Sequence, residues 1–214
     1  MRNMHKKMSS QQFVKGGFPR ELVMVIGIMG YSGSGKSTLS EEFKKLGAFV
    51  IDADKIGKDI LSPGSEGLKK VISVFGEEFL FPDGSLNRKM LGEVVFKSRE
   101  KLELLNSITW AQIDKKIKEA VAASEERVTI IDCPLLYKVS SYKLCHEVIF
   151  INTPDEILIK RIMKRDGLDY NTAKARIDSQ KDEAFIKHAT IILENTSVEG
   201  LKADAERLMK GWLK

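Results

Sequence analysis

Residues 30–37 read Gly-Tyr-Ser-Gly-Ser-Gly-Lys-Ser and fit the phosphate-binding pattern G-x-x-x-x-G-K-[ST]. The glycines allow a tight turn whose backbone N–H groups approach an anion closely. Lys36 can reach the β- and γ-phosphates of a nucleotide, and the Ser37 hydroxyl can ligate Mg²⁺. A glycine-rich turn that binds nothing is the alternative. The residues expected to hold the nucleotide here are Gly30, Ser32, Gly33, Ser34, Gly35, Lys36, Ser37 and Thr38.

The surrounding elements suit such a phosphate site. An apolar run over residues 22–29 predicts a buried strand before the loop, and residues 37–46 have helical spacing of apolar side chains after it. Further strands are predicted over residues 47–51, 128–133, 148–151 and 190–193, with helices between them. This alternation predicts an α/β P-loop fold, with a five-stranded parallel sheet covered by helices on both faces.

Acidic residues follow two of these strands, where ligands bind in an open α/β sheet. Asp52 and Asp54 are spaced so that one caps the next helix and the other faces the site, and we expect Asp54 to be the functional acid. Asp132 ends an apolar strand, as a Walker-B aspartate that holds Mg²⁺ through water does.

Two other regions are predicted to complete the site. Residues 55–126 form a long helical insert, too long for a simple crossover between strands, whose alternative role is to cap the sheet edge. Beyond it, Arg161 and Arg165 lie four apart on one helical face and can clamp phosphate oxygens. A solvated basic face is the alternative. A break at Gly167 between two arginine-rich helices would suit a mobile lid.

Composition narrows the possible partners and compartment. Lys and Arg total 35 and Asp and Glu 30, but five of the basic residues lie in residues 1–20, where no acid occurs. The rest is formally neutral, so we expect no nucleic-acid partner. No apolar run is long enough for a membrane span, and the tail lacks the apolar region of a secretory signal. An organelle transit peptide is disfavoured by the tail's lysines and glutamines.

The two cysteines, Cys133 and Cys145, form no evident disulfide framework, and Cys133 is expected to be a buried thiol. We therefore expect a reducing, cytoplasmic location.

An ordered series of further motifs resembles the dephospho-CoA kinase family. It includes Asp52-Ala53-Asp54 and extends from about Val23 to the C-terminus, which makes it more specific than the P-loop alone. The motifs occupy residues 51–56, 62–64, 75–76, 83–88, 95–96, 134–136, 160–161, 165–166 and 180.

This resemblance implies transfer of the ATP γ-phosphate to the ribose 3′-hydroxyl of dephospho-coenzyme A, the last step of coenzyme A synthesis, with Mg²⁺. It implies that Asp54 is the general base, while Lys36 and Arg161 stabilise the transferring phosphoryl group. Arg165 and Asn195 would bind the nucleotide, Asn195 near the adenine. The residues assigned to the acceptor are Asp54, Lys58, Arg88 and Thr109.

The resemblance also implies a division of the chain. The basic extension is residues 1–20, the nucleotide-binding core comprises 21–54, 127–155 and 189–214, the acceptor domain 55–126 and the lid 156–188. We expect a monomer whose partners are its small-molecule substrates.

The sequence departs from the family pattern at four places. Thr109-Trp110 replaces a usual His-Pro, Lys138 a usual Glu, Lys58 a usual Arg, and Ala189-Thr190 a usual Ala-Asp. Two alternatives therefore stay open: a kinase of another small acceptor, such as a nucleoside monophosphate, and a non-kinase nucleotide switch. A GTP switch should carry Asn/Thr-Lys-x-Asp, and the nearest stretch, residues 163–166, begins with Met163 and has a helical pattern.

Overall fold

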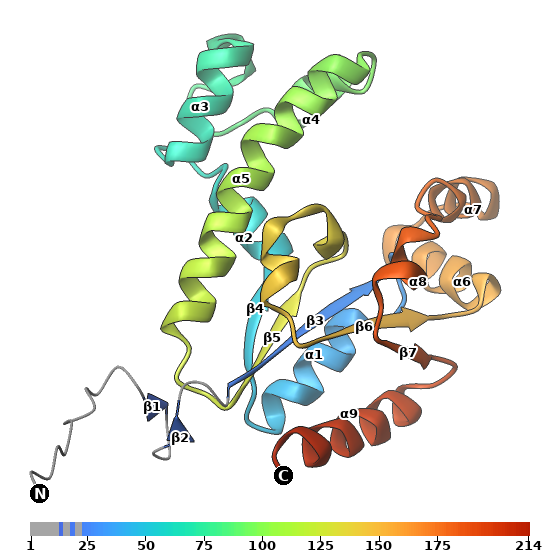
Figure 1. Ribbon diagram of the computed structural model, residues 1–214. Helices are drawn as coiled ribbons and strands as arrows, with labels where there is room; N and C mark the ends of the chain where they lie inside the picture. Colours follow the sequence, from blue (N-terminus) through green and yellow to red (C-terminus); the bar gives the residue numbers. More distant parts are fainter. Residues whose placement is uncertain (1–12, 15–17, 20–22) are drawn as a thin grey trace, which may run out of the picture.

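A twisted parallel sheet forms the centre of the computed structural model, which describes residues 13–14, 18–19 and 23–214 (Figure 1). Its strands, in the spatial order β4-β5-β3-β6-β7, are β4 (Phe49–Asp52), β5 (Val128–Asp132), β3 (Met24–Gly30), β6 (Glu147–Asn152) and β7 (Ile191–Glu194). All neighbouring pairs are parallel, which confirms the predicted five-stranded sheet. The observed strand ends lie within two residues of the predicted ones, and β5 begins at the predicted Val128, because apolar patterns locate strand ends only approximately.

The N-terminal region contributes a separate two-stranded antiparallel pair, β1 (Phe13–Val14) with β2 (Phe18–Pro19). The other residues of the predicted basic extension lie outside the described part of the chain, as does residue 22, where the first strand of the large sheet was expected to begin.

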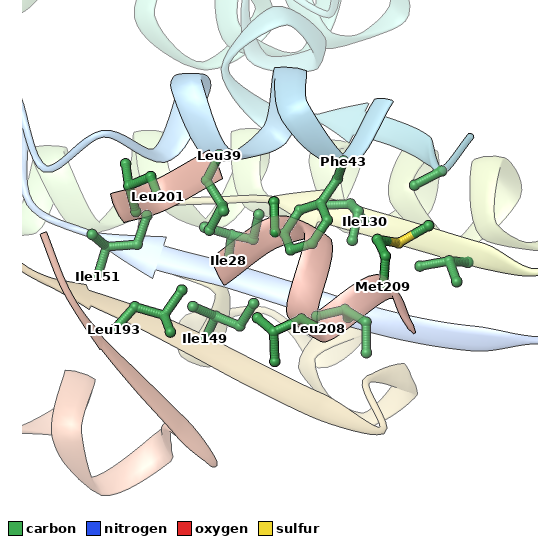
Figure 2. Packing of buried hydrophobic residues seen from close by; sticks show 14 residues of the cluster. Ile28, Leu39, Phe43, Ile130, Ile149, Ile151, Leu193, Leu201, Leu208 and Met209 are labelled. Atoms are coloured by element: carbon green, nitrogen blue, oxygen red, sulfur yellow. The ribbon is translucent and has the colours of Figure 1, made fainter. Parts of the chain in front are cut away.

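One face of the sheet is covered by α1 (Lys36–Lys45) and α9 (Val198–Trp212) (Figure 2). Leu39 and Phe43 stand four apart on α1 and pack against Ile28 and Ile130 of the central strands. Phe43 is fully buried, and truncating such a ring to alanine costs about 3–5 kcal/mol. This packing fixes the axis of α1, and therefore the direction in which its N-terminus points.

The opposite face packs against α5 (Arg99–Ala123) and α8 (Ala184–His188), which supply the buried side chains Ile117 and Phe185. Cys133 belongs to this cluster, as predicted, and burial raises the pKa of its thiol to about 12. Neither Cys133 nor Cys145 forms a disulfide.

The insert between β4 and β5 is helical, as predicted, and extends away from the sheet (Figure 1). Its elements are α2 (Ala53–Asp59), α3 (Glu66–Phe75), η3 (Glu77–Phe79), α4 (Arg88–Val95) and the long α5. Leu68, Val71, Leu91 and Val95 form a small core of their own. The insert therefore has packing that is separate from that of the sheet, while α5 belongs to both.

Two helices follow β6: α6 (Asp155–Asp166) and α7 (Tyr170–Asp178). They pack through Leu158, Ile162, Ala173 and Ile177, and α6 ends at Gly167 in the left-handed conformation that glycine adopts most easily. Throughout the described residues, no helix combines the length and apolar character required to cross a membrane.

Candidate active site

The loop between β3 and α1 has the geometry of a phosphate cradle. Gly33 and Gly35 have positive φ angles of 80° and 101°. A Cβ atom added to Gly35 would lie 2.5 Å from the Asn195 side-chain nitrogen and 2.8 Å from Leu201, so only glycine fits there. The loop leads directly into α1 at Lys36, so the positive end of the helix dipole points at the cradle.

Residues that directly follow β6 and the edge strand β7 hold this loop. The Ser34 carbonyl accepts hydrogen bonds from Thr153 Oγ1 at 3.1 Å and Asn195 Nδ2 at 2.6 Å. Thr153 and Asn195 follow β6 and β7 and are almost completely buried. Asn195 also lines the cavity, while its Oδ1 has no hydrogen-bond partner among the described residues. The side chain of Asn195 thus bonds to the loop through its nitrogen, and its predicted contact with adenine stays a prediction.

Lys36 is folded over the loop it belongs to. Its ammonium donates to the carbonyls of Gly30 at 2.9 Å and Tyr31 at 3.1 Å. Burial lowers the pKa of Lys36, and the nearby Asp132 and Asp54 carboxylates oppose that shift. The cation is thus held at the mouth of the cradle by backbone oxygens.

Of the two acids at the end of β4, one caps a helix, as the spacing predicted, while both line the cavity. Asp52 caps α2, where its carboxylate accepts a hydrogen bond from the Lys55 amide at 2.9 Å. Asp54 lies in the first turn of α2, is exposed and lines the cavity. Asp132 is level with Asp52 in the neighbouring strand and accepts from Ser40 Oγ at 2.8 Å. Burial raises the pKa of Asp132, and the Ser40 hydrogen bond opposes the shift.

The arginine-bearing helices reach the loop directly. Arg161 donates to the Gly33 carbonyl at 3.0 Å, and Arg165 donates to Ser32 Oγ at 3.1 Å. The Ser32 amide donates to Gln180 Oε1 at 2.8 Å. Asp166 accepts from both Arg165 and Arg176. These contacts favour a role at the phosphates over a solvated basic face.

One cavity of about 830 Å³ joins these groups. The predicted site residues on its wall are Gly30, Ser32, Gly33, Gly35, Lys36, Ser37, Thr38, Asp54, Lys58, Asp132, Arg161, Arg165 and Asn195. Ser34, the remaining predicted residue of the loop, is buried and does not line the cavity.

Two residues predicted to bind the acceptor do not line this cavity. The Arg88 side chain donates to the Lys58 carbonyl at 3.3 Å, and the Thr109 hydroxyl donates to the Leu105 carbonyl of its own helix at 2.9 Å. Arg88 therefore contacts α2 at Lys58, a residue of the cavity wall. Their assignment to the acceptor stays a prediction.

Several wall or support residues were missed in the sequence. Tyr137, Lys138 and Gln180 line the cavity, and Thr153 holds the loop. Thr153 had a detectable signal, because it follows a buried strand on the ligand-binding edge of the sheet. Gln180 belonged to a recognised motif, but nothing local pointed to its contact with Ser32, which lies far away in the sequence.

A cradle over a helix N-terminus, a lysine at its mouth, and arginines from a separate helical segment together define a P-loop kinase. Solved structures of shikimate kinases from Bacteroides thetaiotaomicron and Acinetobacter baumannii share the fold, each with a TM-score of 0.52, at 18% and 14% identity. A sequence profile described as dephospho-CoA kinase matches residues 24–199, and the chain belongs to the dephospho-CoA kinase family.

Individual relatives agree with this assignment. The chain is 38% identical to a dephospho-CoA kinase of Carboxydothermus hydrogenoformans, over 88% of this chain and 94% of the relative. It is 36% identical to one of Arabidopsis thaliana, over 86% and 82% of the two chains. The structure of dephospho-CoA kinase from Campylobacter jejuni is similar, with a TM-score of 0.63, 33% identity, and coverage of 87% of this chain and 95% of the other.

Proposed function

We propose that this protein transfers the γ-phosphate of ATP to the 3′-hydroxyl of dephospho-coenzyme A. The observation that carries the proposal is the single cavity that Lys36, Asp54 and Lys58 share. An acceptor hydroxyl beside Asp54 lies next to a phosphate chain seated on the loop, so the two substrates meet without a large rearrangement.

On the nucleotide side, the backbone amides of the loop and the N-terminus of α1 bind the phosphates. The ammonium of Lys36 exchanges its two carbonyl partners for phosphate oxygens, and Arg161 and Arg165 turn from the loop to the γ-phosphate. These cations stabilise the negative charge on the transferring group. Asn195, which donates to the Ser34 carbonyl and lines the cavity, would lie near the adenine.

On the acceptor side, Asp54 orients the 3′-hydroxyl and accepts its proton as the oxygen attacks the γ-phosphorus. The bond from that phosphorus to the ADP oxygen breaks as the new bond forms, and ADP leaves. Asp54 suits this role because its carboxylate is exposed to the cavity, whereas Asp52 is engaged as a helix cap.

The oxygen ligands near the cradle fit Mg²⁺, which prefers hydroxyl, carboxylate and phosphate oxygens. Ser37 and the buried carboxylate of Asp132 both line the cavity and would hold the ion, Asp132 through water. Within the described residues, no group of three His, Cys, Asp or Glu side chains could hold a metal. Such a site therefore relies on substrate phosphates. When bound, Mg²⁺ neutralises phosphate charge.

We assign the acceptor domain to residues 55–126 and the lid to 156–188, on the nucleotide-binding core of 21–54, 127–155 and 189–214. Lys58 would contact the acceptor directly, Arg88 would act through α2, and Thr109 would contribute from α5. We further propose a monomer in the cytoplasm, and the mass of the purified protein in light scattering tests the monomer.

The deciding experiment is an acceptor panel with purified protein, ATP and Mg²⁺, and ADP release as the readout. Dephospho-coenzyme A should be strongly preferred over AMP, dTMP, adenosine and pantothenate. Faster turnover with a nucleoside monophosphate would make the protein a kinase of another acceptor. ATP hydrolysis that ignores every acceptor would make it a nucleotide switch, although the stretch nearest to a guanine signature, at Met163, lies inside α6.

A further inference from the structure

Lys138 is a cavity residue to which the reaction described above assigns no role. It ends η4 (Leu136–Lys138), in the segment between β5 and β6 that lies between the helical insert and α8 (Figure 1). Its ammonium lies 5.8 Å from the ring centroid of Trp110 on α5 and 5.6 Å from that of Tyr137. Both distances are in the range of cation–π attraction.

The two rings form a defined seat for this cation. The Tyr137 hydroxyl donates to Asp182 at 2.7 Å, and its ring packs against Phe185 and His188 near α8. Trp110 is half-buried on the other side, in the middle of the long helix α5. The exposed side chain of Lys138 is thereby attracted to two rings, one on the helical insert and one beside α8, before any ligand arrives, which reduces the entropy lost on binding.

The charge of Lys138 is not neutralised by the protein. Among the described residues, no carboxylate lies within 4.0 Å of its ammonium, whereas Lys181 on the same cavity wall is paired with Asp155 at 2.5 Å. The pKa of Asp182 is lowered mainly by hydrogen bonds from the Ala184 amide and the Tyr137 hydroxyl, and less by the charge of Lys138. The Asp182 carboxylate is therefore already engaged by other groups. The seat thus presents an unpaired cation to the cavity.

The position of this cation is on the acceptor side. Lys58 follows Asp54 by one helical turn on α2, and Lys138 follows Asp132 in the loop after β5, the strand beside β4. Neither lysine belongs to the P-loop or to α6. Both lysines line the same cavity as Asp54, so an acceptor whose hydroxyl meets Asp54 shares that cavity with both ammonium groups, and the acceptor proposed above carries a diphosphate.

We propose that Lys138, seated on Trp110 and Tyr137, binds the diphosphate of the acceptor and sets the preference for acceptors that carry one. This inference rests on the proposed function. It also joins two of the departures from the family pattern, because Trp110 and Lys138 are far apart in the sequence but touch in the structure. Trp110 and Lys138, which stand where the family usually has other residues, thus act as one unit.

The test compares Lys138→Gln and Lys138→Glu with Lys143→Glu, a matched change at an exposed lysine of η5 (Ser140–Leu144) outside the cavity. The KM for dephospho-coenzyme A should rise about 3- to 10-fold for Gln and about 10-fold or more for Glu, since a charge-assisted contact is lost. The kcat, the KM for ATP and the kinetics with adenosine, which has no diphosphate, should stay within about 2-fold. Lys143→Glu should change nothing.

Trp110→Leu keeps an apolar side chain, although a smaller one, and removes the ring face, so it should raise the same KM by a smaller factor. The double variant with Lys138→Gln should have a KM for dephospho-coenzyme A close to that of Lys138→Gln alone, because both substitutions disrupt the same contact between Lys138 and Trp110. Equal losses with adenosine, a change in the KM for ATP alone, or fully additive effects would each overturn the proposal.

Equilibrium binding of dephospho-coenzyme A separates this inference from the proposed function. If wild type turns the acceptor over and Lys138→Glu binds it equally well, Lys138 has no such role while the function stands. If wild type neither binds nor phosphorylates it, the function and this inference both fail. A circular-dichroism melt of each variant shows that the compared proteins are folded.

Discussion

The cavity has two walls that differ in their contacts. Hydrogen bonds within the protein tie together the nucleotide wall, which we define as the P-loop with Arg161, Arg165, Gln180 and Asn195. On the acceptor wall, which we define as Asp54, Lys58 and Lys138, the charged groups have no such bonds among the described residues. Arg161, Arg165 and Gln180 all contact the P-loop. Among the described residues, the side-chain carboxylate of Asp54 and the ammonium of Lys58 take part in no hydrogen bond or ion pair within the protein. The first wall is held together by contacts within the protein, whereas these two charged groups are available to a ligand.

This difference indicates what kind of defect to expect on each side. A change on the nucleotide wall alters a loop whose shape depends on several distant residues, so it should affect rate and stability together. A change at an acceptor-wall side chain that only binds the acceptor should appear in the KM for that substrate with little effect on folding, whereas a change at the proposed base Asp54 should appear in kcat.

The largest effect should come from Lys36→Ala. Loss of a cation from the transferring phosphoryl group should lower kcat by about 10³–10⁵-fold, the range over which comparable cations act in phosphoryl transfer. Lys44→Ala, an exposed lysine on the same helix, is the control in the steady-state assay. A Lys36→Ala enzyme with near-normal turnover would remove the basis for treating the loop as the catalytic wall.

Asp54→Asn should come next, with a kcat about 10²–10⁴-fold lower, because the amide keeps the shape but cannot accept the proton. ATP binding, measured by calorimetry, should barely change, as expected for the acceptor side. Asp59→Asn on the same helix is the matched control. An unchanged kcat would leave Asp52, or no side chain, as the base.

The double variant Arg161→Ala/Arg165→Ala should lower kcat more than it weakens ATP binding, since both arginines act most strongly on the transferring group. Lys160→Ala/Lys164→Ala removes the same charge at the same spacing from exposed positions of α6. If both doubles lose only thermal stability and to the same extent, α6 is a solvated basic face rather than part of the nucleotide wall.

Asn195→Ala should lower the free energy of unfolding by about 1–3 kcal/mol, since a buried hydrogen bond to the Ser34 carbonyl is lost. The KM for ATP should rise as well, and Asn171→Ala at an exposed site on α7 should do neither. Denaturant unfolding measures the change in the free energy of unfolding, and steady-state kinetics measures the KM for ATP. A stable variant with normal ATP affinity would show that the nucleotide wall does not depend on β7.

The smallest effect is expected for Arg88→Ala, which should raise the KM for dephospho-coenzyme A by about 3- to 10-fold through its single hydrogen bond to α2. Lys89→Ala is the neighbouring control on α4. An equal rise in the KM for ATP would contradict the separation of the two walls.

Local sequence features predicted much of the nucleotide wall. Its glycines, lysine and flanking elements are adjacent in the chain, and the spacing of Asp52 and Asp54 already implied one cap and one exposed acid. The hydrogen-bond partners of the Lys36 ammonium were not predictable. Its side chain is flexible, and only the folded loop brings the carbonyls of Gly30 and Tyr31 within reach of it.

The acceptor wall was less predictable because it depends on contacts between distant segments. The seat of Lys138 on Trp110 arises only when α5 packs beside the loop after β5. Likewise, nothing local indicated that Arg88 would contact the backbone of α2, whereas the bond of the Thr109 hydroxyl to the Leu105 carbonyl, four residues earlier in the same helix, is a common local pattern for threonine.

The hydrogen bonds to the Ser34 carbonyl also bear on how the protein is synthesised. The P-loop is made early, but its two supporting side chains, Thr153 and Asn195, follow Ser34 by 119 and 161 positions. During translation the loop would leave the ribosome long before either support. We expect the nascent chain to acquire ATP affinity only when β7 has emerged, so that unfinished chains neither trap nor hydrolyse ATP.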